Sequence, residues 1–464
     1  MKRTLRLAPQ PIRKIFTSVA RRAIGYLPPP SSRLTGALAR YGGRPVRDVW
    51  LRPWASVDDG NFIRWHAEMR GMFRRIFVRG IEGIPQPLAE QFGQQWADYC
   101  GCRFGFLLSH GTDALRIGLA AVLDHDGLDY GGEIIVPNFS FIASATAALD
   151  RRFGVAFVDV DPGTLLLDPK RVEEAIIPGK TRAILPVHLF GQPVEMTALR
   201  AIADKHGLKI VEDAAQAHGA VWKDGPVGSL GDVAGFSFQS FKNLSSGEGG
   251  ALTTNDEQVF ERAYSMHNTG RSRIVGDRWA HVTLGWNCRV TEYQAGLLIH
   301  RFRVFDRMQS VRRKNFQYLR ELMTDVACLE PLALDAGVRA HGMYMFAMRY
   351  RQEYCGGISI DDFIELIQAE GVPLYRAFDA TLSDQIMIQN LMKKRPEYFR
   401  RLPTPVADRA ARETVYIPQN IFLGTAEDMV EIIAAVKKVE RHCSRDTSAR
   451  PTKRLRVAAV EHCS

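Results

Sequence analysis

From about residue 104 onward, short apolar runs alternate with longer stretches in which apolar residues recur at helical spacing. The runs have the length of strands buried on both faces, and the stretches between them are long enough for crossover helices. This alternation predicts an α/β fold with a largely parallel sheet between two layers of helices. The expected strands are 104–109, 133–137, 155–160, 183–189, 208–213 and 233–238, and the expected helices are 112–124, 141–150, 169–176 and 195–206.

The pattern changes after about residue 300. A charged helical stretch at 299–325 leads into weaker strand and helix signals, and an amphipathic helix at 425–441 follows. Length alone allows up to three domains, but one large domain with a smaller partner fits equally well. We therefore expect a basic N-terminal extension (1–50), a large domain (51–300), a smaller C-terminal α+β domain (301–441) and a basic C-terminal tail (442–464).

The formal net charge of +10 is concentrated at the two ends of the chain. Residues 1–47 contain eleven Lys or Arg and no acid, and residues 437–464 contain eight bases against three acids, so the body is net negative. A nucleic-acid enzyme usually carries its basic face on the folded domain. We therefore expect solvated tails and no nucleic-acid partner. Salt-dependent binding through the tails, to a nucleic acid or a membrane surface, is the alternative.

Three further features bear on the compartment. Apolar residues at helical spacing between Ile12 and Ile24 allow either a membrane-surface helix or a short helix docked on the body. No apolar run reaches the ~18 residues that span a bilayer, and the N-terminus lacks the apolar core of a signal peptide. The seven cysteines form no zinc pattern, because Cys100 and Cys102 are too close for a usual pair. We expect reduced thiols, no metal site and a cytoplasmic protein.

The first candidate for chemistry is Lys242, which follows the strand 233–238 in a polar loop that leads into a Gly-rich turn. A lysine at a strand end can be desolvated, and its neutral amine can then condense with an aldehyde. Ser237 and the loop amides could hold a phosphate nearby. A surface lysine beside a glycine turn is the simpler interpretation of this segment alone.

Two other strand ends add to this picture. Asp213 ends the strand 208–213, where its charge could keep a pyridine nitrogen protonated, although it could also be a helix N-cap. After the strand 104–109, Gly111 and Thr112 open a helix whose free N–H groups suit a phosphate. An ordinary capped turn would look the same. A phosphate site, a strand-end carboxylate and a loop lysine along one parallel sheet together indicate a pyridoxal 5′-phosphate (PLP) site.

Over roughly residues 85–440 the sequence resembles the DegT/DnrJ/StrS family of sugar aminotransferases. The resemblance implies the type I PLP aminotransferase fold, with a mostly parallel seven-stranded sheet. It rests on a set of motifs that are specific in combination: SHGTDAL at 109–115, VPNFSF at 136–141, PVHLFGQ at 186–192, VEDAAQAHGA at 211–220, FSFQ at 236–239, KNLSSGEGG at 242–250 and GWNCRVTEYQA at 285–295.

The resemblance also implies roles for individual residues. Lys242 is the catalytic residue, which forms the Schiff base with PLP and carries the proton. Asp213 pairs with the pyridine nitrogen, Gln216 lies near the cofactor hydroxyl, and Phe141 lies over the pyridine face. An isolated phenylalanine such as Phe141 is also compatible with a place in the core.

The phosphate is assigned to Ser237 and to the amides of Gly111 and Thr112. Asn287 matches the residue that reaches the phosphate from a neighbouring subunit, so the resemblance implies a homodimer with shared sites. His188 and His218 also match family positions, and each is equally well explained as a structural, hydrogen-bonded histidine.

Two departures bear on the substrate. Many members that act on nucleotide sugars have His three residues before the lysine, where this chain has Gln239. The pattern is more similar to the branch that acts on cyclitol ketones such as scyllo-inosose or makes aminohydroxybenzoate. The long basic extension is not required by the family core.

We expect the protein to transfer an amino group from glutamate or glutamine to a ketone. The acceptor is either a nucleotide-linked keto-sugar or a cyclitol, in amino-sugar or aminocyclitol biosynthesis. A PLP-dependent sugar dehydratase is an alternative, but a histidine replaces the lysine in that branch. A non-catalytic or regulatory protein of the same fold is another.

Overall fold

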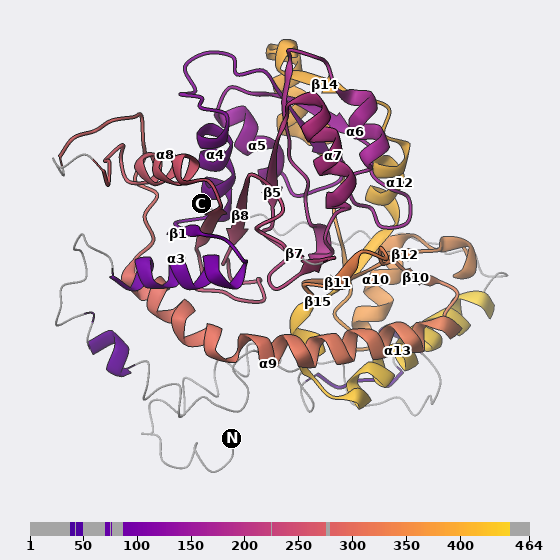
Figure 1. Cartoon of the computed structure of the whole chain (residues 1–464). Coiled ribbons are helices and arrows are strands. Elements are labelled where there is room, and N and C mark those ends of the chain that lie inside the picture. Colours follow the sequence, from indigo (N-terminus) through magenta and orange to yellow (C-terminus); the bar gives the residue numbers. More distant parts are fainter. Residues whose placement is uncertain are drawn as a thin grey trace, which may run out of the picture.

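The computed structural model describes residues 38–41, 43–49, 70–74, 76, 87–223, 225–274 and 279–445. An eight-stranded sheet forms the centre of its larger part, in the order β1-β9-β8-β5-β4-β2-β3-β14 (Figure 1). Its strands run parallel except for β9, which pairs antiparallel with β1 and β8. They are β1 (Phe104–Leu108), β2 (Glu133–Pro137), β3 (Gly154–Val158), β4 (Thr181–Ile184), β5 (Lys209–Asp213), β8 (Val233–Ser237), β9 (Gly250–Thr254) and β14 (Phe399–Arg401).

Helices cover this sheet on both faces, as the alternating pattern predicts (Figure 1). β2, β3 and β8 are buried at every position, which explains why their sequences are continuous apolar runs. A second apolar cluster around Phe92 and Trp96 packs α3 against the β1 side of the sheet. The helices are α3 (Pro87–Tyr99), α4 (Gly111–Val122), α5 (Ala143–Asp150), α6 (Pro169–Ala175), α7 (Met196–His206) and α8 (Glu257–His267).

We expected a seven-stranded sheet, but the observed sheet has eight strands. The eighth strand, β14, comes from residues 399–401, which lie in the range assigned to the small domain, and it pairs with β3 through Phe399 and Val155. Three residues that include two arginines carry no apolar run, so the sequence pattern contains no signal for this strand.

The smaller part has its own sheet, in the order β10-β12-β15-β13, and its own apolar core around Phe346 and Phe363. The long helix α9 begins at a capping box on Thr291 and runs along both parts (Figure 1). A third sheet, β11-β6-β7, pairs a strand from this half of the chain with two from the large part. These elements are α9 (Glu292–Leu322), β10 (Leu329–Pro331), β11 (Val338–Ala340), β12 (Met345–Tyr350), α10 (Ile360–Ala369), β13 (Tyr375–Arg376), β15 (Thr414–Pro418), α13 (Ala426–Arg445), β6 (Val221–Trp222) and β7 (Gly225–Pro226).

The segment 381–411 leaves the small part and returns to the large sheet. It contains α11 (Ile386–Lys394) and most of α12 (Pro405–Glu413). The Asp159 carboxylate after β3 accepts hydrogen bonds from the first amides of α12, those of Val406 and Ala407, at 3.1 and 2.8 Å. A buried carboxylate at a helix N-terminus satisfies amides that would otherwise lack partners. The segment is thereby fixed beside the carboxyl ends of the parallel strands.

Hydrogen bonds and ion pairs with buried partners attach the described part of the N-terminal extension to the small domain. The Glu370 carboxylate, at the end of α10, accepts from the amides of Ala39 and Val46 at 2.8 and 3.0 Å and from Lys438 Nζ at 2.8 Å. Arg47 is 4% exposed and donates to the Glu431 carboxylate of α13 at 2.8 Å. The extension therefore contributes to the fold at its junction with the body.

We expect Glu370→Ala to lower the free energy of unfolding by about 3 kcal/mol, because it leaves two backbone amides without their acceptor and removes the buried carboxylate that pairs with Lys438. Urea unfolding followed by tryptophan fluorescence measures this. Glu365→Ala is the matched control, since Glu365 pairs with Arg40 at the surface, where both side chains are about half exposed. If both variants lowered the free energy of unfolding equally, Glu370 would not anchor the extension.

Some expectations concern residues outside the described part. The apolar positions between Ile12 and Ile24 are among them, as are residues 446–464. α13 runs to Arg445, a little beyond the expected end at 441. Within the described ranges, no helix combines the length and apolarity that crossing a membrane requires.

Candidate active site

Three strands bring the predicted site residues to one edge of the large sheet. β1, β5 and β8 are parallel, so the turn at Gly111, Asp213 and Ser237 all follow or end strands on the same side. β9 returns between β1 and β8, and it can do so only because Gly250 has no side chain. A Cβ there would lie 2.4 Å from the carbonyl of His110. Three regions that are distant in sequence thus form one site.

Lys242 lies in the loop between β8 and β9, with Nζ 4.3 Å from the centre of the Tyr344 ring. Burial lowers the pKa of its amine to about 8, and the negative charge of Asp213 opposes that shift. The loop is held in place by Asn243, whose side-chain amide donates to the carbonyls of Gly342 and Met343 at 2.7 and 3.0 Å. The lysine is therefore held between the two parts of the molecule, with an amine that loses its proton at a lower pH than a free lysine does.

Gln239, which stands where many relatives have His, shapes this loop. Its side-chain carbonyl accepts from the Phe241 amide at 2.9 Å, and its backbone carbonyl accepts from the Lys242 amide at 2.8 Å. These bonds turn the chain immediately after Phe238. Gln239 is thus tied to the conformation of the lysine loop.

The Asp213 carboxylate is buried at the end of β5. Ser144 Oγ of α5 donates to one of its oxygens at 2.7 Å, and the Ala215 amide donates to the other at 3.2 Å. Burial raises the pKa of Asp213, while these two hydrogen bonds and the Lys242 charge act in the opposite direction. Neither bond is a helix cap, so the simple capping interpretation of Asp213 does not hold.

The turn before α4 fits a phosphate. His110, at the N-cap of α4, makes no side-chain capping bond to the helix amides. A Cβ on Gly111 would come within 2.8 Å of Ser237 Cβ, so the glycine allows the helix amides to approach the serine closely. The Asp113 carboxylate in the same turn is engaged by Arg116 Nε at 2.8 Å, so its charge is compensated. Thr112 is exposed at the helix start.

These residues can be compared with known proteins. The profile of the DegT/DnrJ/EryC1/StrS aminotransferase family matches residues 80–437. The chain belongs to this family. A putative L-glutamine:3-amino-2,3-dideoxy-scyllo-inosose aminotransferase of Streptoalloteichus tenebrarius is 35% identical over 427 residues, with 88% of this chain and 99% of that protein covered.

Two further comparisons agree with this. An L-glutamine:2-deoxy-scyllo-inosose aminotransferase of the same organism is 33% identical, with 87% of this chain and 98% of that protein covered. The crystal structure of 3-amino-5-hydroxybenzoic acid synthase superposes with a TM-score of 0.71 at 26% identity, covering 81% of this chain and 96% of that one. The type I PLP aminotransferase fold and the family resemblance are thereby confirmed.

The chain is a PLP-dependent aminotransferase of the DegT family. The geometry fits that cofactor, because an uncapped helix start, a buried carboxylate and a buried amine lie around one edge of the sheet. We propose that Ser237 with the Gly111 and Thr112 amides would hold the phosphate, Asp213 the pyridine nitrogen and Lys242 the aldehyde carbon.

Three other predicted residues have less direct support for a role toward the cofactor: Gln216, Phe141 and Asn287. The Gln216 side chain is buried after β5 and accepts from the Phe190 amide at 2.8 Å, which supports Phe190 in a left-handed conformation with φ 59°. Phe141 is 57% exposed, just before α5. Asn287 is exposed and forms a backbone bridge to Asn268 at the base of a hairpin. Their roles toward the cofactor remain predictions.

The two histidines have structural surroundings. His188 Nε2 lies 3.0 Å from the Glu212 carboxylate, and its Nδ1 accepts from the Val194 amide at 3.1 Å. His218 is buried among the rings of Trp96, Phe236 and Phe238. Burial lowers the pKa of His218 to about 3, so the ring is neutral.

Sequence reasoning missed Tyr344, Asn243 and Ser144. Tyr344 lies in a stretch with weak strand signals, and only the fold brings its ring to Lys242. Asn243 directly follows the lysine, but its partners are about a hundred residues further along the chain. Ser144 is on α5, in the helix that follows the VPNFSF motif, and that proximity was its only available signal.

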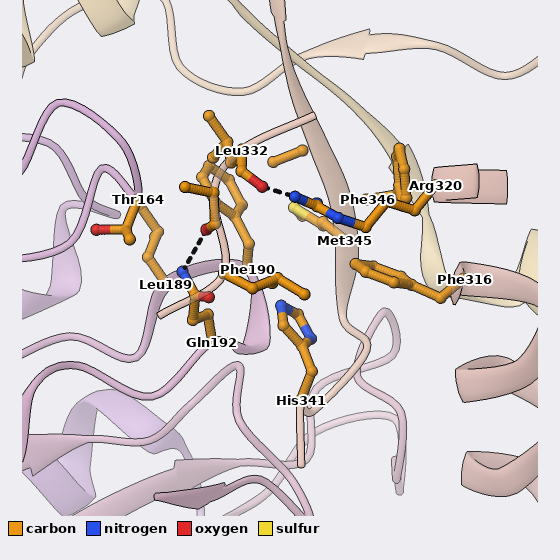
Figure 2. A pocket seen from close by; sticks show the side chains of 13 residues that line it. Thr164, Leu189, Phe190, Gln192, Phe316, Arg320, Leu332, His341, Met345 and Phe346 are labelled. Atoms are coloured by element: carbon orange, nitrogen blue, oxygen red, sulfur yellow. Dashed lines mark hydrogen bonds between the residues drawn. The ribbon is translucent and has the colours of Figure 1, made fainter. Parts of the chain in front are cut away.

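A small cavity lies nearby between the two parts, as Figure 2 shows. Phe190, His341 and Phe346 line it, and the Gln192 amide and the Arg320 guanidinium each donate to a backbone carbonyl beside it. Its volume of about 20 Å³ accommodates roughly one water molecule. It is therefore too small to bind a cyclitol or a sugar.

The lowered pKa of Lys242 predicts how the PLP-free protein takes up PLP with pH. Only the neutral amine attacks an aldehyde. Its fraction rises through a pKa of about 8, so the uptake rate should rise about tenfold per pH unit below that value and level off above it. Stopped-flow absorbance measures the rate, with Nα-acetyl-lysine as the unshifted control. A rate that still climbs steeply toward pH 10 would show that the amine is not perturbed.

Proposed function

We propose that this protein transfers the amino group of L-glutamine to the ketone of a cyclitol of the scyllo-inosose type, in aminocyclitol biosynthesis. Two relatives with that donor and that class of acceptor in their names align over nearly their whole length. The observation that carries the proposal is the buried Lys242 amine next to Asp213. Gln239, in place of the histidine of many nucleotide-sugar enzymes, supports a cyclitol over a nucleotide-linked keto-sugar.

The chain's own residues have distinct tasks in this reaction. PLP, when bound, supplies an electron sink for the electrons left on the substrate carbon. The neutral Lys242 amine removes a proton from the donor carbon in the first half-reaction and returns one to the former ketone carbon in the second. Asp213 provides the buried negative charge that keeps the pyridine nitrogen protonated, and the Tyr344 ring holds Nζ in position. The dehydratase alternative is not favoured, since these relatives are aminotransferases.

The test is a two-stage assay on purified, PLP-loaded enzyme. L-Glutamine alone should convert the cofactor absorbance to that of pyridoxamine phosphate, and 2-deoxy-scyllo-inosose should restore it. L-Glutamate and a nucleotide-linked 4-keto-sugar are run in parallel. Faster restoration by the keto-sugar than by any cyclitol ketone would refute the proposed acceptor, and a response to glutamate alone would refute the proposed donor.

We further propose that the enzyme works as a homodimer with shared sites. Two arms of a hairpin, 268–274 and 279–287, lie beside α8 (Figure 1) and expose Ile274, Val282 and Leu284, each more than half accessible. Phe241, next to the catalytic lysine, is 74% exposed. Large apolar side chains of this kind are typical of surfaces that a partner covers. Asn287, on the same hairpin, would then complete the partner's phosphate site.

Mixing two inactive variants tests this arrangement. Lys242→Ala and Asn287→Ala proteins should each be inactive or severely impaired. After subunit exchange, a mixed dimer has one site with both residues intact, so about a quarter of wild-type activity should return. Light scattering gives the mass in parallel. A fully active monomer, or a mixture that stays inactive although the subunits exchange, would exclude shared sites.

We propose a cytoplasmic location. Five cysteines of the described chain are buried and form no disulfide, which suits a reducing compartment; they are Cys100, Cys102, Cys288, Cys328 and Cys355.

A further inference from the structure

A buried glutamine on α9 joins three segments that adjoin the catalytic lysine. α9 runs along both parts of the molecule (Figure 1), and Gln309 lies near its middle with no exposed surface. Its side-chain nitrogen donates to the carbonyls of His218 and Gly342 at 2.9 and 3.0 Å. Its side-chain oxygen accepts from Asn243 Nδ2 and Arg312 Nη1, both at 3.0 Å. All four hydrogen-bonding positions of this amide are therefore used.

Three of these groups form a closed ring of hydrogen bonds between the lysine loop and the small domain. Asn243 Nδ2 also donates to the Gly342 carbonyl at 2.7 Å, so Gln309, Asn243 and Gly342 are each bonded to the other two. Lys242 directly precedes Asn243, and Tyr344 follows Gly342 by two residues. The ring thus fixes the backbone on both sides of the 4.3 Å contact between Lys242 Nζ and the Tyr344 ring.

Packing alone does not require a glutamine at this position. An apolar side chain of the same length would fill the space without the cost of burying an amide. α9 also carries a second buried amide, Asn315, which donates to the carbonyls of Phe422 and Gly424 at 3.0 and 2.8 Å. Both of those partners belong to the small domain. Gln309 differs from Asn315 because the backbone segments to which it bonds lead directly to active-site side chains.

We propose that Gln309 is a positioning residue, which holds the Lys242 amine and the Tyr344 ring together across the two parts of the molecule. This role rests on the proposed function of Lys242 in amino transfer. By tying the lysine loop to Gly342, Gln309 keeps the amine away from water and close to the donor carbon whose proton it removes. A displacement of about 1 Å can slow such a step about a hundredfold.

The first test is the pH dependence of PLP uptake by full-length, PLP-free protein. Burial lowers the pKa of Lys242 to about 8, so a lysine loop that opens to water should let this pKa rise toward its ordinary value. Gln309→Met keeps the volume of the side chain and removes its hydrogen bonds. The midpoint of the uptake rate should therefore move up by at least about one pH unit, which makes uptake about tenfold slower at pH 7.

The other titratable groups that act on Lys242 remain in every variant. Asp213 opposes the effect of burial on the lysine pKa. His218 is neutral because burial lowers its pKa to about 3, and burial raises the pKa of Tyr344. A midpoint that differs between variants therefore reports a change in the burial of Lys242.

Asn315→Leu is the matched control. It removes a buried amide of the same helix that also donates to two backbone carbonyls, so it should lower the stability of the protein. Its uptake midpoint should remain that of the wild type, because neither carbonyl belongs to a segment that carries the lysine or Tyr344. A midpoint that shifts equally in Asn315→Leu and Gln309→Met would overturn the proposal, since any loosening of α9 would then suffice.

The PLP-loaded enzyme gives a second readout. Gln309→Met should lower kcat with L-glutamine by at least about tenfold and leave KM within about threefold, because the lysine acts in the transition state. Asn243→Ala opens the same ring from the side of the lysine loop and should shift the uptake midpoint in the same direction. It carries the test if Gln309→Met does not fold.

A wild-type midpoint in Gln309→Met, or in Asn243→Ala if the first variant does not fold, would also overturn the proposal. Borohydride reduction followed by peptide mass spectrometry separates this result from failure of the proposed function. Wild-type label at another lysine would remove the role of Lys242 itself. Label at Lys242 with an unshifted midpoint would exclude the role of Gln309 alone.

Discussion

Lys242→Ala protein is expected to have lost aminotransferase activity, with kcat at least about a thousandfold below wild type. The variant lacks the amine that lies against the Tyr344 ring and would carry the proton. The assay is the half-reaction with L-glutamine, followed by absorbance under single-turnover conditions.

The same variant gives a covalent readout. Borohydride should fix PLP to the wild-type chain at Lys242, as peptide mass spectrometry would show, and should leave Lys242→Ala unlabelled. Lys223→Ala is the matched control, because Lys223 also lies near an aromatic ring but is about half exposed, and it should retain label and activity. Label at another lysine in the wild type would remove the basis of the proposed function.

Asp213→Asn should reduce kcat by about a thousandfold while PLP still binds, because the amide fits the same space but cannot keep a ring nitrogen protonated. Ser144→Ala should have a much smaller effect, since it removes one hydrogen bond and leaves the charge in place. A cofactor analogue with a permanently charged ring nitrogen should rescue Asp213→Asn and leave Ser144→Ala unchanged. Near-normal activity of Asp213→Asn with PLP would show that the carboxylate is structural.

Much of the large domain was predictable because its signals are local. Strands buried on both faces must be apolar throughout, so five of the six predicted runs agree with observed strands to within two residues. The sixth, 183–189, extends five residues beyond β4, which ends at Ile184. The helices between them also begin and end near the predicted positions, because their apolar residues recur at helical spacing. The site followed from this sheet, since Asp213 and Ser237 end neighbouring parallel strands and must share an edge.

The small domain was predicted only in outline. Its helices α9 and α13 were visible as periodic stretches, but its strands are short and carry mixed side chains. The return of residues 381–411 to the large sheet, with β14 as an eighth strand, depends on contacts between segments about 250 residues apart. Local patterns contain no information about such pairings.

The sequence by itself determined the parallel sheet, the order of the catalytic elements and the lysine, aspartate and serine that they present, because buried strands and glycine turns restrict residue types locally. Only the tertiary structure decided what surrounds those residues. It places the Tyr344 ring against the lysine amine, bonds the N-terminal extension to Glu370 and leaves Nη2 of Arg349 without an acceptor. A pKa, a buried ion pair and an unpaired donor depend on which distant groups come within a few ångströms, and chain folding alone sets those distances.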